Sequence, residues 1–340
     1  SKYEAQLGST HRASGDNLSA DDYDAMPPST DPLGFKDAIW KDELPGSRSD
    51  QVVYTQPVVT RRSVVYRHKN IVYCRSLLNG ELLWANNVGG RVTWQNRHER
   101  QYPMEGVVAQ DGMIFTVMHK VGPSLVALDE VTGQMKWAYG AMVASGREEA
   151  LMRFEATPAG GPGAIYAAYI LANIEGDTHT DTEYGVIAFE SATGRILWRR
   201  EISRLQPGQF SAGFAVSRRN KIRSWTSPPL YHQGTVYHCT DAGTTVALDA
   251  LSGRVKWLMR YPYWPVIHDA TRVFGALPEW SGTVFSHGMH EPSAWFNQRP
   301  WITGDRLYVL PVDSTIMHCL DRRTGKVEWS RIKHGGNYTH

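Results

Sequence analysis

From about residue 56 onward, short apolar runs alternate with clusters of turn-forming residues. The clearest such segments are QPVVTRRSVVY from Gln56, EGVVAQDGMIF from Glu105, ATPAGGPGAIY from Ala156, SPPLYHQGTVY from Ser227 and RPWITGDRLYV from Arg299. Short runs rich in Val, Ile, Tyr and Phe between Gly, Pro, Asn or Asp predict pairs of β-strands joined by tight turns. The pattern therefore predicts an all-β chain.

Each of these segments is followed by a second pattern, and its five copies align without gaps. The copies are CRSLLNGELLW, ALDEVTGQMKW, AFESATGRILW, ALDALSGRVKW and CLDRRTGKVEW. Every copy ends in a tryptophan with a glycine four residues before it: Gly80 and Trp84, Gly133 and Trp137, Gly194 and Trp198, Gly253 and Trp257, and Gly325 and Trp329. Four copies also place an acid four residues before the glycine, and the first copy has Ser76 there.

This second pattern predicts a hairpin. The acidic side chain can cap the backbone of the turn, the glycine supplies a positive φ, and the tryptophan lies in the outgoing strand. With the two upstream strands, each copy makes a four-stranded antiparallel sheet, and such repeats are typical of a β-propeller.

The repeat sets the expected domain organisation. We expect a polar arm or linker over residues 1–50 and a propeller over 51–340, with blades at about 56–88, 105–140, 156–200, 227–258 and 299–331. Successive repeat tryptophans are 53, 61, 59 and 72 residues apart, more than the roughly 40–50 residues of a minimal blade. Insertions are therefore expected at 140–156, 200–226 and 259–298.

The pattern A-L-D-x-x-[TS]-G-x-x-x-W resembles the tryptophan-docking repeat of the PQQ-like (quinoprotein dehydrogenase-like) propeller family over about residues 56–330. The resemblance implies that the five tryptophans and five glycines above pack neighbouring blades together. It also implies a ring of about eight blades, within the range usual for propellers. Further blades are then expected on the same precursor, on another chain, or as degenerate copies inside the insertions.

The family resemblance allows two classes of function. A quinoprotein dehydrogenase would need PQQ on a tryptophan floor, carboxylate and amide ligands for Ca²⁺, and an aspartate base, commonly with a disulfide between adjacent cysteines. Cys74, Cys239 and Cys319 are not adjacent and read as small buried side chains, and the acids of the repeat belong to turns. We therefore assign no catalytic or cofactor-binding residue and expect no cofactor, with PQQ and Ca²⁺ as the alternative.

Composition excludes some partners. The 36 basic and 34 acidic residues give a net charge of +2, which provides no global field toward nucleic acid or an anionic membrane. No apolar run approaches the ~18 residues of a membrane-spanning helix. We expect no nucleic-acid role and no transmembrane segment.

The insertion at 259–298 is the most aromatic part of the chain. Trp264, Trp280 and Trp295 could line a ligand pocket or a protein interface, or could be buried within a cap formed by the insertion itself. His287 and His290, with His268, have a spacing that could bind a metal, although solvated or internally hydrogen-bonded histidines fit the same pattern.

A basic run occupies the insertion at 200–226. Arg218 and Arg219 lie in it and could dock an anionic partner, or belong to a solvated loop. Taken together, the sequence favours a non-catalytic propeller that presents loop insertions to a protein or a small ligand. The alternative is a PQQ- and Ca²⁺-dependent alcohol or sugar dehydrogenase, or the propeller subunit of an electron-transfer complex. Family resemblance implies an extracytoplasmic (periplasmic or secreted) location.

Overall fold

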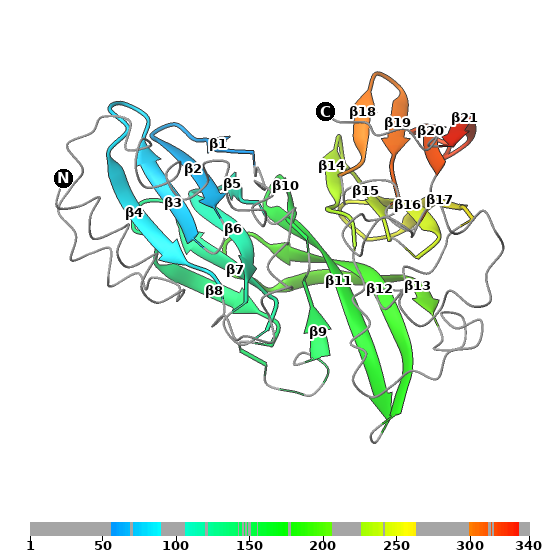
Figure 1. Cartoon of the computed structure of the whole chain (residues 1–340), viewed down its shortest axis with the longest axis horizontal. Helices are drawn as coiled ribbons and strands as arrows, with labels where there is room; N and C mark the ends of the chain where they lie inside the picture. Colours follow the sequence, from blue (N-terminus) through cyan, green and yellow to red (C-terminus); the bar gives the residue numbers. More distant parts are fainter. Residues whose placement is uncertain are drawn as a thin grey trace, which may run out of the picture. The chain divides into compact units, whose positions relative to one another are not determined.

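The fold is all-β, and its strands form sheets that follow the repeat (Figure 1). The computed structural model describes residues 56–68, 71–89, 106–119, 122–141, 143–144, 146, 148, 151–154, 156–175, 178–205, 226–240, 242–262, 299–311, 314 and 316–332. Within this part of the chain, five sheets are present, and each contains one copy of the repeat. The predicted fold class of four-stranded antiparallel blades is confirmed.

The first two sheets each have four strands in sequence order. Their strands are β1 (Val58–Val59), β2 (Ser63–His68), β3 (Ile71–Ser76) and β4 (Leu82–Asn87), then β5 (Val108–Gln110), β6 (Met113–Met118), β7 (Ser124–Asp129) and β8 (Met135–Tyr139).

The third sheet has the order β10-β11-β12-β13, and β9 also pairs with β11. Its strands are β9 (Met152–Arg153), β10 (Ala159–Gly161), β11 (Ala164–Glu175), β12 (Thr178–Glu190) and β13 (Ile196–Leu205). β13 thus continues into the segment that the repeat spacing assigns to an insertion.

The last two sheets again have four strands in sequence order. Their strands are β14 (Leu230–His232), β15 (Thr235–Cys239), β16 (Thr244–Asp249) and β17 (Val255–Arg260), then β18 (Trp301–Thr303), β19 (Arg306–Val309), β20 (Ile316–Asp321) and β21 (Val327–Ile332).

The chain divides into two compact units, and the division falls within the third copy of the repeat. The first unit is residues 1–163 with 191–195, and the second is 164–190 with 196–340. Each unit has its own core. In the first, Val65, Cys74 and Trp84 pack with Ile114 and Leu128.

The core of the second unit repeats this arrangement. Tyr237, Ala247 and Trp257 of one sheet pack with Leu307 and Leu320 of the next sheet. Burial of aliphatic and aromatic side chains from facing sheets is the main term that holds such layers together.

Turn chemistry explains why each copy folds as a hairpin. Asp129 accepts hydrogen bonds from the backbone N–H groups of Val131 and Thr132, at 3.0 and 2.9 Å, and from the Thr132 hydroxyl. Gly133 then adopts a φ of 70°, in the left-handed region that favours glycine. Asp249 and Asp321 cap their own turns in the same way.

The strand after each turn has a bulge at one constant repeat position. The register between the third and fourth strands shifts directly after Cys74, Ala127, Ala188, Ala247 and Cys319, the residues opposite the repeat tryptophans. A bulge sharpens the local twist of a strand pair, so the repeat fixes the twist of the sheet edge together with the position of the tryptophan.

Among the described residues, no helix has the length and apolar character needed to cross a membrane.

Candidate functional site

The third sheet differs from the others in strand length. β11, β12 and β13 have 12, 13 and 10 residues, whereas β15, β16 and β17 of the next sheet have 5, 6 and 6. Figure 1 shows β11 and β12 running together as a long antiparallel pair. We call the outer part of these three strands the arm. It consists of Tyr169–Glu175 of β11, Thr178–Gly185 of β12 and Glu201–Leu205 of β13.

A glycine allows the arm to begin where it does. Tyr169 pairs directly with Gly185 on the neighbouring strand. A Cβ added at Gly185 would lie 2.5 Å from the Tyr169 ring, so a side chain there would displace the tyrosine. The Tyr169 ring therefore lies close to Gly185, and its hydroxyl donates to Glu183.

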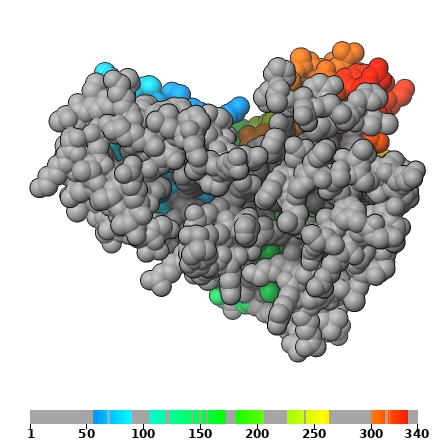
Figure 2. All heavy atoms as spheres, in the orientation of Figure 1, coloured from blue at the N-terminus to red at the C-terminus, as the bar shows by residue number. Residues whose placement is uncertain are grey.

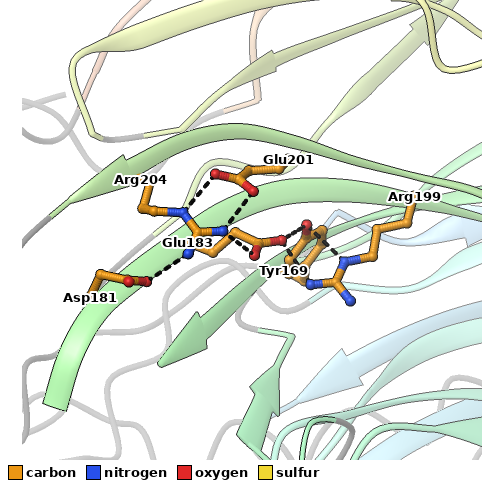
Figure 3. A network of polar contacts seen from close by, with 6 residues as sticks. All are labelled: Tyr169, Asp181, Glu183, Arg199, Glu201 and Arg204. Carbon is orange, nitrogen blue, oxygen red and sulfur yellow. Dashed lines mark hydrogen bonds and ion pairs between the residues drawn. The ribbon is translucent and has the colours of Figure 1, made fainter. Parts of the chain in front are cut away.

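A buried carboxylate forms the centre of the arm (Figure 3). Glu183 is only 5% exposed. Its Oε1 lies 2.8 Å from Arg199 Nη2, its Oε2 lies 3.1 Å from Arg204 Nη2, and the hydroxyl of Tyr169 donates to Oε1. Three donors on two strands therefore satisfy one carboxylate, which is the condition for burying such a charge without a large penalty.

The two arginines extend the network outward. Arg199 lies over the Tyr169 ring at 4.8 Å and donates to its hydroxyl. Arg204 bonds to Glu201 at 2.7 Å and to Asp181 at 3.2 Å. Three carboxylates thus face two guanidinium groups, so the network nearly compensates its own charge.

Three groups of the network have shifted pKa values that keep one protonation state near neutral pH. Burial raises the pKa of the Tyr169 hydroxyl well above its ordinary value, so it remains a donor. The hydrogen bond from Arg204 lowers the pKa of Glu201, and the same bond raises that of Arg204. The neutral Tyr169 hydroxyl and the charged Glu201 and Arg204 therefore hold the strands together and are not poised for proton transfer.

The repeat tryptophans lie at the contacts between successive sheets. The indole N–H groups of Trp84, Trp137, Trp198 and Trp257 donate at 2.9 Å to the carbonyl oxygens of Glu130, Ser191, Ala250 and Arg322 respectively. Each of these carbonyls stands three residues before the glycine of the next copy.

The glycine of the next copy receives the indole face. A Cβ added at Gly133 would lie 2.7 Å from the Trp84 ring, and one added at Gly253 would lie 2.6 Å from the Trp198 ring. These glycines are therefore needed for the close approach of an indole as well as for their φ. Trp329 has no such acceptor among the described residues.

The remaining predicted site residues lie outside the part of the chain that the structure describes. They are His268, His287, His290, Trp264, Trp280, Trp295, Arg218 and Arg219, together with the N-terminal segment 1–50. Within the described part, no group of three or more His, Cys, Asp or Glu side chains is arranged to bind a metal ion. Cys74, Cys239 and Cys319 are buried, as expected, and form no disulfide with one another.

Sequence comparison supports the repeat. Residues 182–339 match the family model described as outer membrane protein assembly factor BamB. Among curated proteins, none matches the chain.

The solved structures to which this chain is similar are distant from it in sequence. The quinohemoprotein alcohol dehydrogenase from Comamonas testosteroni is 15% identical with a TM-score of 0.50, over 84% of this chain and 44% of that one. A europium-containing methanol dehydrogenase is 13% identical with a TM-score of 0.49, over 83% and 51%. BamB from Moraxella catarrhalis is 13% identical with a TM-score of 0.39, over 83% and 76%. This chain spans about half the length of the two dehydrogenases, and at these identities the likeness concerns the fold alone.

Proposed function

We propose that this chain, which carries the PQQ-like β-propeller repeat, is a non-catalytic scaffold that binds a protein partner through the arm of its third sheet. One observation carries the proposal: a strand extension found in this sheet is held rigid by a buried, nearly charge-compensated network around Glu183. A scaffold needs rigid elements that present a surface, because a preformed surface loses little entropy on binding.

The outer strand of the sheet has the composition of an interface. Where β13 runs along the arm, the side chains of Glu201 and Arg204 are 42% and 43% exposed. Arginine is enriched in protein interfaces. The charges on this edge also oppose unspecific pairing with other strands. The arm can thus bind a partner selectively while resisting aggregation.

The acids of the repeat support a structural role over a catalytic one. Asp129, Asp249 and Asp321 each accept hydrogen bonds from their own turns, chiefly from the Thr132 backbone, the Ser252 hydroxyl and the Thr324 hydroxyl. These bonds hold the pKa of all three carboxyls below the ordinary value. A base that works near neutral pH would need the opposite shift.

The proposal includes an extracytoplasmic site of action. The matching family model is described as an outer membrane protein assembly factor, which supports both a protein partner and a location outside the cytoplasm. Fractionation of the native source, with immunodetection of this chain, tests the location.

A shortened arm tests the binding role directly. Replacing residues 172–182 with Asn-Gly joins Leu171 to Glu183, which already face each other across β11 and β12, through a two-residue hairpin turn. We expect the full-length chain to recover a defined partner from a native extract and the shortened chain to lose it. Tyr169, Glu183, Arg199 and Arg204 all remain, so the circular dichroism spectrum and unfolding midpoint serve as the folding control. Recovery of the same partner by the folded, shortened chain contradicts the proposal.

The opposing enzyme class is tested on the same protein. Addition of PQQ and Ca²⁺ should give no saturable change in absorbance and no dye reduction with simple alcohols or aldose sugars. Saturable binding with turnover identifies a quinoprotein dehydrogenase and removes the scaffold proposal.

A further inference from the structure

A cluster of reactive side chains is buried in the contact between the fourth and fifth sheets, both of which lie in the second unit. Cys239 of β15 packs there in the same hydrophobic cluster as Val309 of β19. His318 on β20 is in direct register with Val309, and residues in direct register point to the same face of a sheet. The thiol of Cys239 and the imidazole of His318 therefore reach one contact from its two sides.

Tyr261 connects these two groups. It follows β17, is 5% exposed, and has its hydroxyl 3.2 Å from Cys239 Sγ. The rings of Tyr261 and His318 are in contact, with 5.7 Å between their centroids and 39° between their planes. The backbone N–H of Tyr261 donates to the Gly243 carbonyl at 3.0 Å, which anchors the residue beside the start of β16. One phenol thus contacts both the thiol and the imidazole.

Two buried polar atoms of this contact have no hydrogen-bond partner among the described residues. The first is His318 Nε2, in a side chain whose Nδ1 lies 2.9 Å from the Ser330 hydroxyl of the same sheet. Nε2 is the ring nitrogen farther from the main chain, so it is directed across the contact. The second is Oγ1 of Thr245, which is in direct register with Cys239. Buried polar atoms nearly always have a partner, so two such atoms beside a thiol indicate a bound species.

The donors at this contact are soft. The register joins Cys239, Thr245 and Met259 in one row, which places both sulfur-bearing side chains on the same face. Met259 also packs against the hydrophobic cluster that contains Cys239. Thiolate and thioether sulfur select Cu⁺ among the common metal ions, and imidazole nitrogen is a good ligand for copper.

Charge favours a monovalent ion over a divalent one. Cys239 supplies one negative charge as a thiolate, and burial lowers the pKa of His318, which keeps the imidazole neutral. Within the described chain, no carboxylate joins these two residues in a group of three metal-binding side chains. Cu⁺ and one thiolate carry no net charge together, whereas Zn²⁺ would leave one positive charge in an apolar site, at a large cost.

We propose that Cys239, His318 and Met259 bind one Cu⁺ ion in the contact between the fourth and fifth sheets. The Cys239 S–H bond breaks, its proton goes to solvent, and the sulfur bonds to the ion without a change of oxidation state. His318 coordinates through the Nε2 lone pair, while its Nδ1–H donates to the Ser330 hydroxyl and fixes the tautomer. Tyr261 is a positioning residue, because its hydroxyl donates to the thiolate.

The surroundings of the site combine access with protection. Met259 is only partly buried, and atoms of the fifth sheet, orange to red, form part of the surface visible in Figure 2. His318 itself is 4% exposed and Cys239 is 1% exposed. An apolar shell of this kind limits the contact of a bound metal with water. The site is separate from the arm, so the outcome of the arm test does not bear on it.

Competition for Cu⁺ tests the site on the purified full-length chain. The reduced protein is titrated with Cu⁺ in the absence of oxygen and in the presence of bathocuproine disulfonate, whose coloured complex measures the Cu⁺ that the protein does not hold. We expect the wild type to retain one Cu⁺ more than Cys239→Ala or His318→Gln. Cys74→Ala and Cys319→Ala are the matched controls and should retain as much as the wild type.

The circular dichroism spectrum and the unfolding midpoint show whether each variant is folded, and Cys239→Ser replaces Cys239→Ala if that variant is not. Equal retention by the wild type and the folded Cys239 variant overturns the proposal. Preferential retention of Zn²⁺ when both ions are offered assigns the site to a divalent ion and overturns it as well.

Tyr261→Phe separates positioning from packing. Phenylalanine keeps a ring against His318 but removes the hydroxyl that donates to the thiolate, so we expect the Cu⁺ affinity to fall about 10- to 100-fold. X-ray absorption at the copper edge should still show sulfur and nitrogen neighbours in this variant. An unchanged affinity, or a copper edge without sulfur neighbours in the wild type, contradicts the assigned ligands.

Discussion

At the scale of single residues, the repeat uses polar groups to fix backbone geometry. Asp129 and Gly133 close a turn. Trp84 of the preceding copy contacts that turn twice, by donating its indole N–H to the Glu130 carbonyl and by packing its ring on Gly133. The three contacts act together, because the carbonyl accepts the indole only while the turn holds its shape. This explains why the acid, the glycine and the tryptophan recur at constant spacing.

A buried histidine gives the chain a pH-dependent stability. His238 on β15 is fully buried beside the Thr226 hydroxyl, 3.2 Å away, and burial lowers its pKa to about 3. Its ordinary pKa is about 6.5, so below that value the unfolded chain binds a proton that the folded chain excludes. The stabilising effect of the neutral ring is complete above about pH 6.5 and is lost as pH falls toward 3.

The predicted slope is up to about 1.4 kcal/mol per pH unit between about pH 6 and 4. Chemical denaturation at pH 7, 6 and 5 measures it, with His238→Gln as the non-titrating comparison. We expect the difference in unfolding free energy between the wild type and this variant to shrink as the solution is acidified. A difference that stays constant over this range contradicts the assignment of a neutral His238.

At the scale of elements, the arm depends on a carboxylate that the sequence pattern did not reveal. Glu183→Gln removes the charge that holds Arg199 and Arg204, whose side chains are 30% and 43% exposed. We expect a loss of about 2 kcal/mol in unfolding free energy, below the usual cost of breaking a fully buried pair because the arginines keep some water contact.

Glu201→Gln is the matched control for that change. Glu201 is 42% exposed and pairs with the same Arg204 at 2.7 Å, so we expect its replacement to cost less than about 1 kcal/mol. Urea denaturation of the two variants measures both values. Equal losses would show that burial of Glu183 adds nothing to the stability of the arm.

The repeat could be predicted from sequence because its signals are local. Turn acid, glycine and tryptophan lie within nine residues, from Asp249 to Trp257, and their physical roles can be read from that spacing. The arm could not be predicted in this way, because Tyr169, Glu183 and Arg199 come from three strands and meet only through register. The available signal was the alternation of Asp181 and Glu183 before a strand-like run, together with unusually long strand-like segments on both sides of the turn.

At the scale of the whole molecule, each unit is a succession of sheets joined by one type of contact. Contacts between neighbouring copies give repeat proteins a stability that is roughly a sum over neighbours. The family resemblance implied further blades, and that expectation stays a prediction.

The central claim is that turn carbonyls hold the indole N–H groups of the first four repeat tryptophans, whereas Trp329 has no such acceptor among the described residues. Hydrogen exchange of the indole N–H groups, followed by NMR with ¹⁵N-labelled tryptophan and assigned through single Trp→Phe variants, measures this directly. The account predicts slow exchange at Trp84, Trp137, Trp198 and Trp257 and fast exchange at Trp329. Uniform exchange at all five positions, or slow exchange at Trp329 in the isolated chain, would contradict it.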